Sequence, residues 1–246
     1  MNRGKMRIYL TCMDCHGTTV SARSNVYSAE LQDSGCYSFT CSQQHESTVK
    51  LKNPKFEILF ELGLNAIHDG YYREAVSSFT SSLERFYEYV INILYRSAGI
   101  NLEQTSQLWK LVSNQSERQF GAYLFVYQLV EKKIPPQLSN KCIKFRNEVI
   151  HKGKIPSRIE AIEYGEAILT VISPVLKVLV EKYDPQILEL MREQLNAIDL
   201  KLDVGKSRST MSINTTVSAL RGNDAPPNLC SSLERIAFVR SGLSLL

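Results

Sequence analysis

The sequence predicts a mainly α-helical protein with a small β-structured segment at its N-terminal end. From residue 54 to about residue 200, apolar residues recur at the spacing of amphipathic helices, and strand signals are absent. Before that stretch, four of the six cysteines crowd into the first 41 residues, partly on a segment with the two-residue period of a strand. We therefore expect a β module over residues 1–52, an all-α domain over 53–204 and a flexible tail with one short amphipathic segment over 205–246.

The composition is that of an ordinary folded protein. The 246 residues are 43% hydrophobic and 22% charged, which argues against a disordered chain. No stretch reaches the roughly 18 consecutive apolar residues that a membrane span needs, and the first residues lack the apolar core of a signal peptide. We expect a soluble, cytoplasmic protein with no membrane partner. The net charge of +4 is too small to identify a partner.

The clustered cysteines predict a structural zinc site. Cys12 and Cys15 form a C-x2-C pair, and Cys41 and His45 follow as a second short pair. In a chain without a secretory signal, such clusters favour metal ligation over disulfides, and Zn²⁺ takes four sulfur or nitrogen ligands in a tetrahedron. Four protein ligands leave no open position for catalysis, so the ion would be structural. Free thiols in a hairpin, or a redox pair, are the alternatives.

The segment around these residues has the pattern of a small zinc ribbon. Alternation over residues 36–41 predicts a strand that brings Cys41 to the site, and residues 20–24 indicate an opposing strand. Cys36 and His16 are spare ligand candidates. We interpret this ribbon as a recognition or docking module for nucleic acid or protein. The lysines at its junction with the helices would help it to bind nucleic acid: Lys50, Lys52 and Lys55.

The helical stretch divides at its turn residues. Apolar spacing predicts helices over about 56–68, 71–97, 103–113, 116–131 and 137–152, a helix that begins at Ser157 and a last one from Asp184 to about Leu200. Gly153 is a natural residue to end a helix. Ser157 and Glu160 have the spacing of a capping box, and Pro174 predicts a kink in the helix that follows.

The helix before Gly153 carries an arginine in an apolar setting. On a helical wheel Arg146 lies in the middle of an arc of apolar residues, and a charge buried there costs several kcal/mol unless it is paired or faces a crevice. Asn147 and His151 lie beside that arc, one turn apart. From Glu131 to Glu160 there are eight Lys or Arg against three Glu, an excess that favours a polyanion partner.

These residues are suited to RNA cleavage without a metal. An imidazole exchanges a proton near neutral pH, and a guanidinium can hold a phosphodiester and its transition-state charge during attack by the RNA 2′-hydroxyl. DNA lacks that hydroxyl and should be inert. The alternative is a solvated basic surface with Arg146 in an internal salt bridge.

The run from Arg146 to His151 resembles the R-x4–6-H signature of the HEPN superfamily, in the form in which Asn follows the Arg. Residues 144–156 resemble the end of a HEPN core helix, and the long helix with residues 82–88 fits the same fold. The resemblance covers roughly residues 53–200. It implies a mainly α protein, a HEPN-like helical bundle preceded by a small β zinc ribbon.

The resemblance also implies roles and partners. Many HEPN proteins are metal-independent endoribonucleases that form symmetric dimers with one composite site, and they act in toxin–antitoxin, abortive-infection and RNA-guided defence systems. Arg146 would then stabilise phosphate charge, His151 would act as general base or acid, and Asn147 would position the substrate. Supporting residues would be Glu84 or Arg85 from the long helix, and Lys152. HEPN toxins silenced by adenylylation carry a Tyr where this chain has Gly153, so that control is not expected.

We therefore expect an endoribonuclease of HEPN type, a toxin or antiviral (abortive-infection) effector with RNA as substrate. It would form a homodimer, need no cofactor for catalysis, and could have an antitoxin or defence-system partner. The first alternative is a non-catalytic HEPN and zinc-ribbon module that binds RNA or a protein. The second is a phage- or plasmid-encoded regulator whose ribbon binds DNA.

Overall fold

The computed structural model describes residues 6–15, 26–199, 207–219 and 228–243. The chain divides into two compact units: residues 1–53, 191–214 and 243–246 make up the first, and residues 54–190 and 215–242 the second. Over the described residues the protein is mainly helical with a small N-terminal β region, so the predicted fold class is confirmed.

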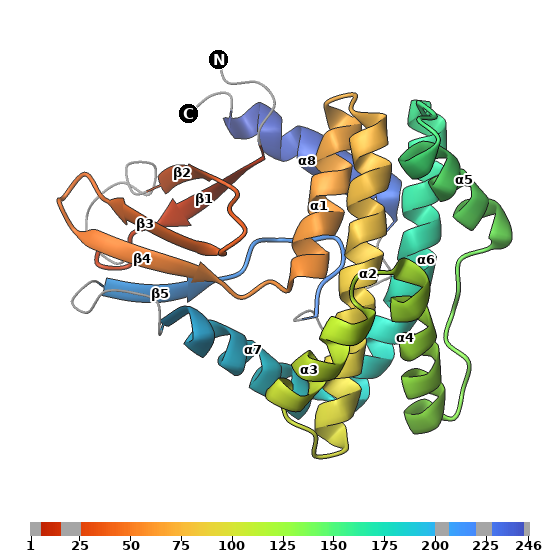
Figure 1. Cartoon of the computed structure of the whole chain (residues 1–246). Coiled ribbons are helices and arrows are strands. Elements are labelled where there is room, and N and C mark those ends of the chain that lie inside the picture. The colour runs from red at the N-terminus through yellow and green to blue at the C-terminus, as the bar shows by residue number, and fades with distance from the viewer. Residues whose placement is uncertain (1–5, 16–25, 200–206, 220–227, 244–246) are drawn as a thin grey trace. The chain divides into compact units, whose positions relative to one another are not determined.

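The first unit contains two small sheets (Figure 1). Strands β1 (Arg7–Thr11) and β2 (Val26–Glu30) pair antiparallel. In the second sheet β4 is central: it pairs antiparallel with β3 and parallel with β5. The bounds of these three strands are Cys36–Thr40, Glu46–Leu51 and Ser207–Met211. The parallel pair joins residues about 160 positions apart in the chain, such as Ser47 and Ser207.

The sequence predicted β3 but not its neighbours. Strand β4 has no alternating pattern, because all of its residues from Ser47 to Leu51 are buried. The opposing strand expected at residues 20–24 lies outside the described residues, and the partner of β3 is β4. The role expected for Lys50 is wrong, because its side chain is only 6% exposed and cannot lie on a nucleic-acid-binding surface. Lys52 is half-buried, and Lys55 is exposed.

The second unit is a helical bundle around the long helix α2 (Tyr72–Ser97). Helices α1, α4 and α6 pack on α2, and α5 contacts it as well (Figure 1). The bounds of the other helices are Lys55–His68 for α1, Leu102–Val112 for α3, Ser116–Glu131 for α4, Asn140–His151 for α5, Arg158–Lys182 for α6, Asp184–Asp199 for α7 and Leu229–Leu243 for α8. Helix α7 begins in this unit and continues into the first.

Aromatic side chains fill the centre of the bundle. Phe60 of α1 and Phe79 of α2 are fully buried, with ring centroids 4.9 Å apart. Glycines on both neighbouring helices make room for Phe79: a Cβ added at Gly63 or Gly165 would lie 2.5 or 2.8 Å from its ring. These two glycines therefore fix how closely α1 and α6 approach α2.

The predicted helix ends are confirmed around α5 and α6. Gly153 has a φ of +73°, the left-handed conformation that ends a helix. Ser157 and Glu160 form a reciprocal capping box at the start of α6. Helix α6 runs through Pro174 without a break. The end of α5, which carries the candidate residues, is thus fixed on both sides.

The C-terminal region differs from the expected flexible tail. Besides β5, the short segment 215–219 is buried in the second unit, where two buried carboxylates of α1 hold it. Glu57 accepts hydrogen bonds from the Thr215 hydroxyl (2.8 Å) and the Ala219 N–H (2.7 Å). Glu61 accepts one from Arg235 of α8 (2.8 Å). A polar composition suggested a linker, but partners about 160 residues away order this segment.

Candidate functional sites

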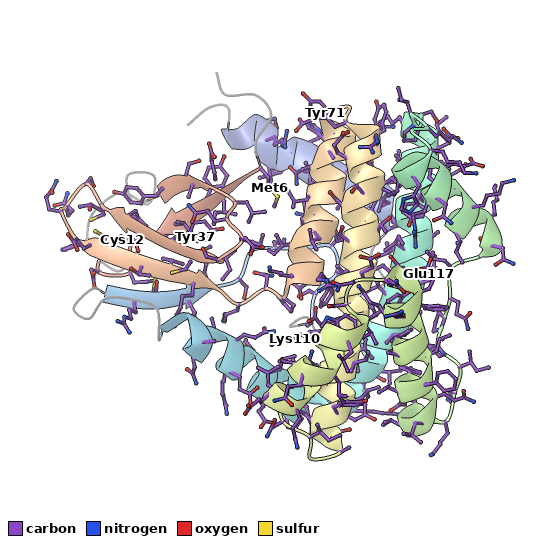
Figure 2. All side chains as sticks on the ribbon, viewed as in Figure 1. Met6, Cys12, Tyr37, Tyr71, Lys110 and Glu117 are labelled. Atoms are coloured by element: carbon purple, nitrogen blue, oxygen red, sulfur yellow. The ribbon has the colours of Figure 1, made fainter. Side chains whose placement is uncertain are left out.

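The first candidate site lies among the strands of the first unit, where Figure 2 labels Cys12. Cys12 and Cys15 follow β1, and the turn between β3 and β4 carries Cys41 and His45. One ligand atom from each of the four side chains lies within 4.8 Å of the others, and the three cysteines are buried. The structure therefore brings together all four predicted ligands, and this cluster could hold a metal ion.

The turn that carries Cys41 and His45 is built around the Cys41 sulfur. The N–H groups of Gln43 and His45 both donate hydrogen bonds of 3.3 Å to Cys41 Sγ. Gln44 adopts a φ of +63°, and the Cys41 N–H donates to the His45 carbonyl at 3.0 Å. Two backbone N–H groups thus converge on Cys41 Sγ, the atom that this residue offers to a metal ion.

Cys12 and Cys15 differ in the direction in which their surroundings shift the pKa of the thiol. Burial and the neighbouring sulfurs of Cys41 and Cys12 raise the pKa of Cys15 to about 12. Burial also acts to raise the pKa of Cys12, but hydrogen bonds with Ser47, the Cys15 backbone and His45 lower it to about 6. Ser47 lies on β4, with its Oγ 3.3 Å from Cys12 Sγ. The sequence analysis missed this serine because β4 was not predicted.

The two spare ligand candidates, Cys36 and His16, are not among the grouped side chains. Cys36 begins β3 and is not part of the cluster, since the four grouped side chains are Cys12, Cys15, Cys41 and His45. His16 lies outside the described residues. Tyr27 and Phe39 stack with centroids 4.5 Å apart and pack against the buried cysteines, which closes the apolar side of the cluster.

The second candidate site lies at α5 in the second unit. Val149 is the fully buried residue of this helix, while Arg146 and Asn147 are half-buried and Ile143 is 38% exposed. Arg146 is thus half-buried between Val149 and Ile150 on the helical wheel, and only Ile143 at the rim of the predicted apolar arc is exposed. No hydrogen bond or ion pair joins Arg146 to another described residue, so the alternative of an internal salt bridge is wrong for this part of the chain.

The charge of Arg146 acts on the pKa values of two buried tyrosines, Tyr87 and Tyr164. Burial raises the pKa of Tyr164 on α6 to about 12, while its hydrogen bond with Thr80 and the charge of Arg146 act in the opposite direction. Burial also raises the pKa of Tyr87 on α2, which Arg146 again lowers in part. Glu84 raises the pKa of both tyrosines, so its carboxylate belongs to the same neighbourhood. The sequence predicted Glu84 here but neither tyrosine.

The remaining predicted residues lie at the end of α5 or on α2. His151 is the last residue of α5, and His151 and Lys152 are exposed. Arg85 points to other partners: its guanidinium donates to Glu88 at 2.7 Å and lies 5.7 Å from the centroid of the Trp109 ring. Arg85 thus serves a contact between α2 and α3. Glu84 accepts a 2.5 Å hydrogen bond from the Ser116 hydroxyl at the start of α4.

Exposed cations lie on α5 and just after it, whereas Lys132 and Lys133 follow Glu131, which pairs with Lys182 at the opposite end of α6. Lys154 is paired with Glu160 at 2.7 Å and lies 4.9 Å from the centroid of the Phe145 ring, so it fixes the loop between α5 and α6. The other basic residues of this region are exposed: Lys132, Lys133, Lys141, Lys144, Lys152 and Arg158. The arrangement offers an unpaired guanidinium, an accessible imidazole and several cations on one part of the bundle.

Comparisons with protein-family models, with curated proteins and with solved structures find no match to this chain. Among the helices described here, none is both long enough and apolar enough to cross a membrane.

Proposed function

We propose that this protein is a metal-independent endoribonuclease of HEPN type, a toxin or antiviral (abortive-infection) effector of the cytoplasm. The observation that carries the proposal is that Arg146 has no partner among the described residues and that His151 is exposed. The guanidinium has no hydrogen bond or ion pair within the described chain, and the imidazole is exposed at the end of the same helix. A costly, half-buried cation without a protein partner is suited to a bound anion.

The reaction needs only groups of the protein and the RNA. His151 takes the proton of the ribose 2′-hydroxyl, the 2′-oxygen attacks phosphorus, and the bond from phosphorus to the 5′-oxygen breaks. The leaving 5′-oxygen takes a proton from solvent water, which gives a 2′,3′-cyclic phosphate and a 5′-hydroxyl, and His151 returns its proton to the solvent. Arg146 stabilises the charge that grows on the phosphoryl oxygens, and Asn147, half-buried on the same helix, positions the substrate.

The proposal includes a homodimer. Ile155 in the loop after α5 is 84% exposed, and Ile159 at the start of α6 is 68% exposed. A second copy of the chain could bury both side chains beside His151. Two R-x4-H helices would then meet in one cleft. Light scattering of the purified chain should give twice the monomer mass, and Ile159→Lys should shift it toward the monomer. An antitoxin or defence-system partner that covers this cleft would silence the enzyme.

The proposal assigns Zn²⁺ to the cluster of the first unit as a structural ion. Tetrahedral zinc with Zn–S bonds of ~2.3 Å requires sulfurs about 3.7 Å apart. Cys15 and Cys41 have their sulfurs 3.7 Å apart, and His45 Nδ1 lies 3.3 and 3.8 Å from the sulfurs of Cys15 and Cys12. These distances fit four-coordinate zinc, which would supply cross-linking of the strands and no step of the reaction.

The test is cleavage of RNA in a magnesium-free buffer with EDTA, with the zinc content of the protein followed by elemental analysis. Wild-type protein should cleave RNA and leave DNA of the same sequence intact. His151→Ala should abolish cleavage without unfolding the protein, and His68→Ala, which removes another exposed histidine at a helix end, should have no effect. Cleavage that survives His151→Ala overturns the assignment.

The alternative function is a module that binds RNA or a protein without cleavage. The exposed lysines around α5 favour it, since they would bind RNA whether or not chemistry follows. Salt-sensitive binding of RNA without turnover would support this alternative. The alternative of a regulator whose ribbon binds DNA would be supported by duplex binding that the full chain loses on Lys52→Ala.

A further inference from the structure

Ser47 lies on the central strand β4 of the second sheet, and its side chain contacts the cysteine cluster. Its backbone is opposite Phe39 of β3 and Ser207 of β5, so strands on both sides fix its position. Its Oγ lies 3.3 Å from Cys12 Sγ. Both side chains are enclosed, since Ser47 is 3% exposed and Cys12 is 1% exposed. This contact joins β4 to the segment that follows β1.

The direction of this hydrogen bond depends on the protonation of Cys12. Either atom can be the donor while the cysteine is a thiol. A cysteine that binds a metal ion has lost its proton, so its sulfur then acts as an acceptor. In a metal-bound cluster the Ser47 hydroxyl is therefore the donor. Within the described residues this hydroxyl has no other hydrogen bond, and a buried hydroxyl needs a partner.

The hydroxyl at the next position of the same strand has a different partner. Thr48 is also 3% exposed, and its Oγ1 lies 2.9 Å from Ser38 Oγ on β3. Successive side chains of a strand point to opposite faces of the sheet. Ser47 and Thr48 are therefore two buried hydroxyls at neighbouring positions, of which the first contacts a candidate metal ligand and the second contacts the adjacent strand.

We propose that Ser47 is a positioning residue of the metal site, whose hydroxyl donates a hydrogen bond to the Cys12 thiolate and orients that ligand toward the ion. The inference rests on the proposed function in taking the cluster as a zinc site. Cys41 Sγ accepts comparable hydrogen bonds from the backbone N–H groups of Gln43 and His45. For Cys12 a side chain of β4 supplies the donor. Such neighbours of metal ligands fix the orientation of the ligand, and their loss commonly lowers metal affinity roughly 10–100-fold.

The experiment measures the affinity of the full chain for Zn²⁺ by competition with a chromophoric chelator. Ser47→Ala removes the hydroxyl that donates to Cys12 and should raise the Kd for Zn²⁺ about tenfold or more. The matched control is Thr48→Val, which removes the neighbouring buried hydroxyl and should leave the Kd within twofold of wild type. Circular dichroism with excess Zn²⁺ should be the same for all three proteins, since the backbone pairing of β4 does not need either hydroxyl.

A second measurement separates an effect on the sulfur from a loosening of the sheet. Co²⁺ bound in place of Zn²⁺ gives a charge-transfer band from thiolate to metal. Loss of a hydrogen bond leaves more electron density on the Cys12 sulfur, so Ser47→Ala should move this band to longer wavelength. Thr48→Val should leave the band in place, because its hydroxyl contacts Ser38.

Several outcomes would overturn the role of Ser47. These are a Kd of Ser47→Ala within twofold of wild type, an equal loss of affinity in Thr48→Val, and a cobalt band that does not move. A Ser47→Ala chain whose circular dichroism with excess Zn²⁺ differs from wild type would assign Ser47 to the fold, and that too overturns the inference.

The inference and the proposed function fail in different ways. If wild type and Ser47→Ala bind Zn²⁺ equally well, the zinc site stands and the role of Ser47 is removed. If wild type binds neither Zn²⁺ nor Co²⁺, the zinc site is removed together with the role of Ser47. The ribonuclease function is tested separately by RNA cleavage in wild type and His151→Ala, and neither result changes the metal affinities.

Discussion

The two candidate sites are built in opposite ways. In the first unit, Cys12, Cys15 and Cys41 are buried, and the side chains that could hold a metal already contact one another and the backbone around them. In the second unit, Arg146 has no hydrogen bond or ion pair with a described residue, and His151 is exposed. The first set of residues is complete within one chain, whereas the proposed function completes the second set with a bound RNA and a second copy.

The residues of the first site contact one another, whereas Arg146 of the second site has no hydrogen bond or ion pair with a described residue, and the proposed function gives it to a ligand. Removing a ligand of the cluster should change stability, because its neighbours depend on it. Removing Arg146 should change binding and leave stability unchanged, because no described side chain relies on it. The predictions below follow from this difference.

The largest effect is expected from Cys41→Ser, which replaces one of four ligands, the sulfur that accepts two backbone hydrogen bonds, by a hydroxyl that binds zinc poorly. Elemental analysis should find about one zinc per wild-type chain and less than a tenth of that in the variant. Structural zinc contributes roughly 10 kcal/mol or more to small domains, so proteolysis should cut the first unit early in the variant. Cys36→Ser is the control, and equal zinc in both variants would contradict the ligand set.

The next effect is expected from Arg146→Ala. Cleavage of RNA should fall about 10²–10³-fold, the usual size of a lost transition-state donor, while the Tm changes by less than about 1 °C. Arg85→Ala should lower the Tm and leave cleavage unchanged, since Arg85 binds Glu88 and covers the Trp109 ring. A large drop in Tm for Arg146→Ala would mean that the guanidinium belongs to the fold, and the contrast between the sites would be lost.

Residue spacing predicted both sites, but it determined the geometry of the first site better than that of the second. The metal ligands follow from spacing alone, since C-x2-C and C-x3-H each fit within one turn, and the structure brings both turns together. The R-x4-H pair also follows from spacing, but its orientation does not. Ile143 counted as part of the apolar arc and is 38% exposed, and Arg146 is half-buried whereas its neighbour Val149 is fully buried. Only the packing of α5 on α2 determines that rotation.

Long-range contacts account for most of what the sequence did not predict. The helices of the bundle follow from local periodicity and caps such as Ser157 and Glu160. Strand β5 and the segment 215–219 depend on β4 and on Glu57, about 160 residues earlier, which no local pattern reveals. Tyr164 likewise joins the site through a contact between helices, since its ring packs against Phe145 of α5. Thr80, Glu84 and Tyr87 share a face of α2, and that spacing was the one local signal for them.

A smaller effect is expected from the exposed cations near α5. Lys152→Ala should weaken RNA binding a few-fold at low salt and reduce the slope of log Kd against log salt by ~0.7, the value for one contact with a single strand. Lys177→Ala, an exposed lysine of α6 that lies 3.8 Å from Glu181, is the control and should leave the slope unchanged. An unchanged slope for Lys152→Ala would remove that lysine from the RNA-binding surface.

The smallest effect is expected at Glu160, which fixes the loop after His151. The ion pair with Lys154 and the hydrogen bond from the Ser157 N–H lower the pKa of Glu160 to about 2 from its ordinary value of 4.5. A carboxyl with a lowered pKa stabilises the fold above its unfolded pKa, and this stability is lost as the pH falls from about 4.5 toward 2. The Tm of Glu160→Gln should therefore lie slightly below wild type at pH 6, and the gap should close by pH 2.5. Because the pair is partly exposed, the gap is small and shrinks in high salt. A gap that persists at pH 2.5 would mean that the amide disturbs the capping box itself, and the charge of Glu160 would not be what holds the end of α5.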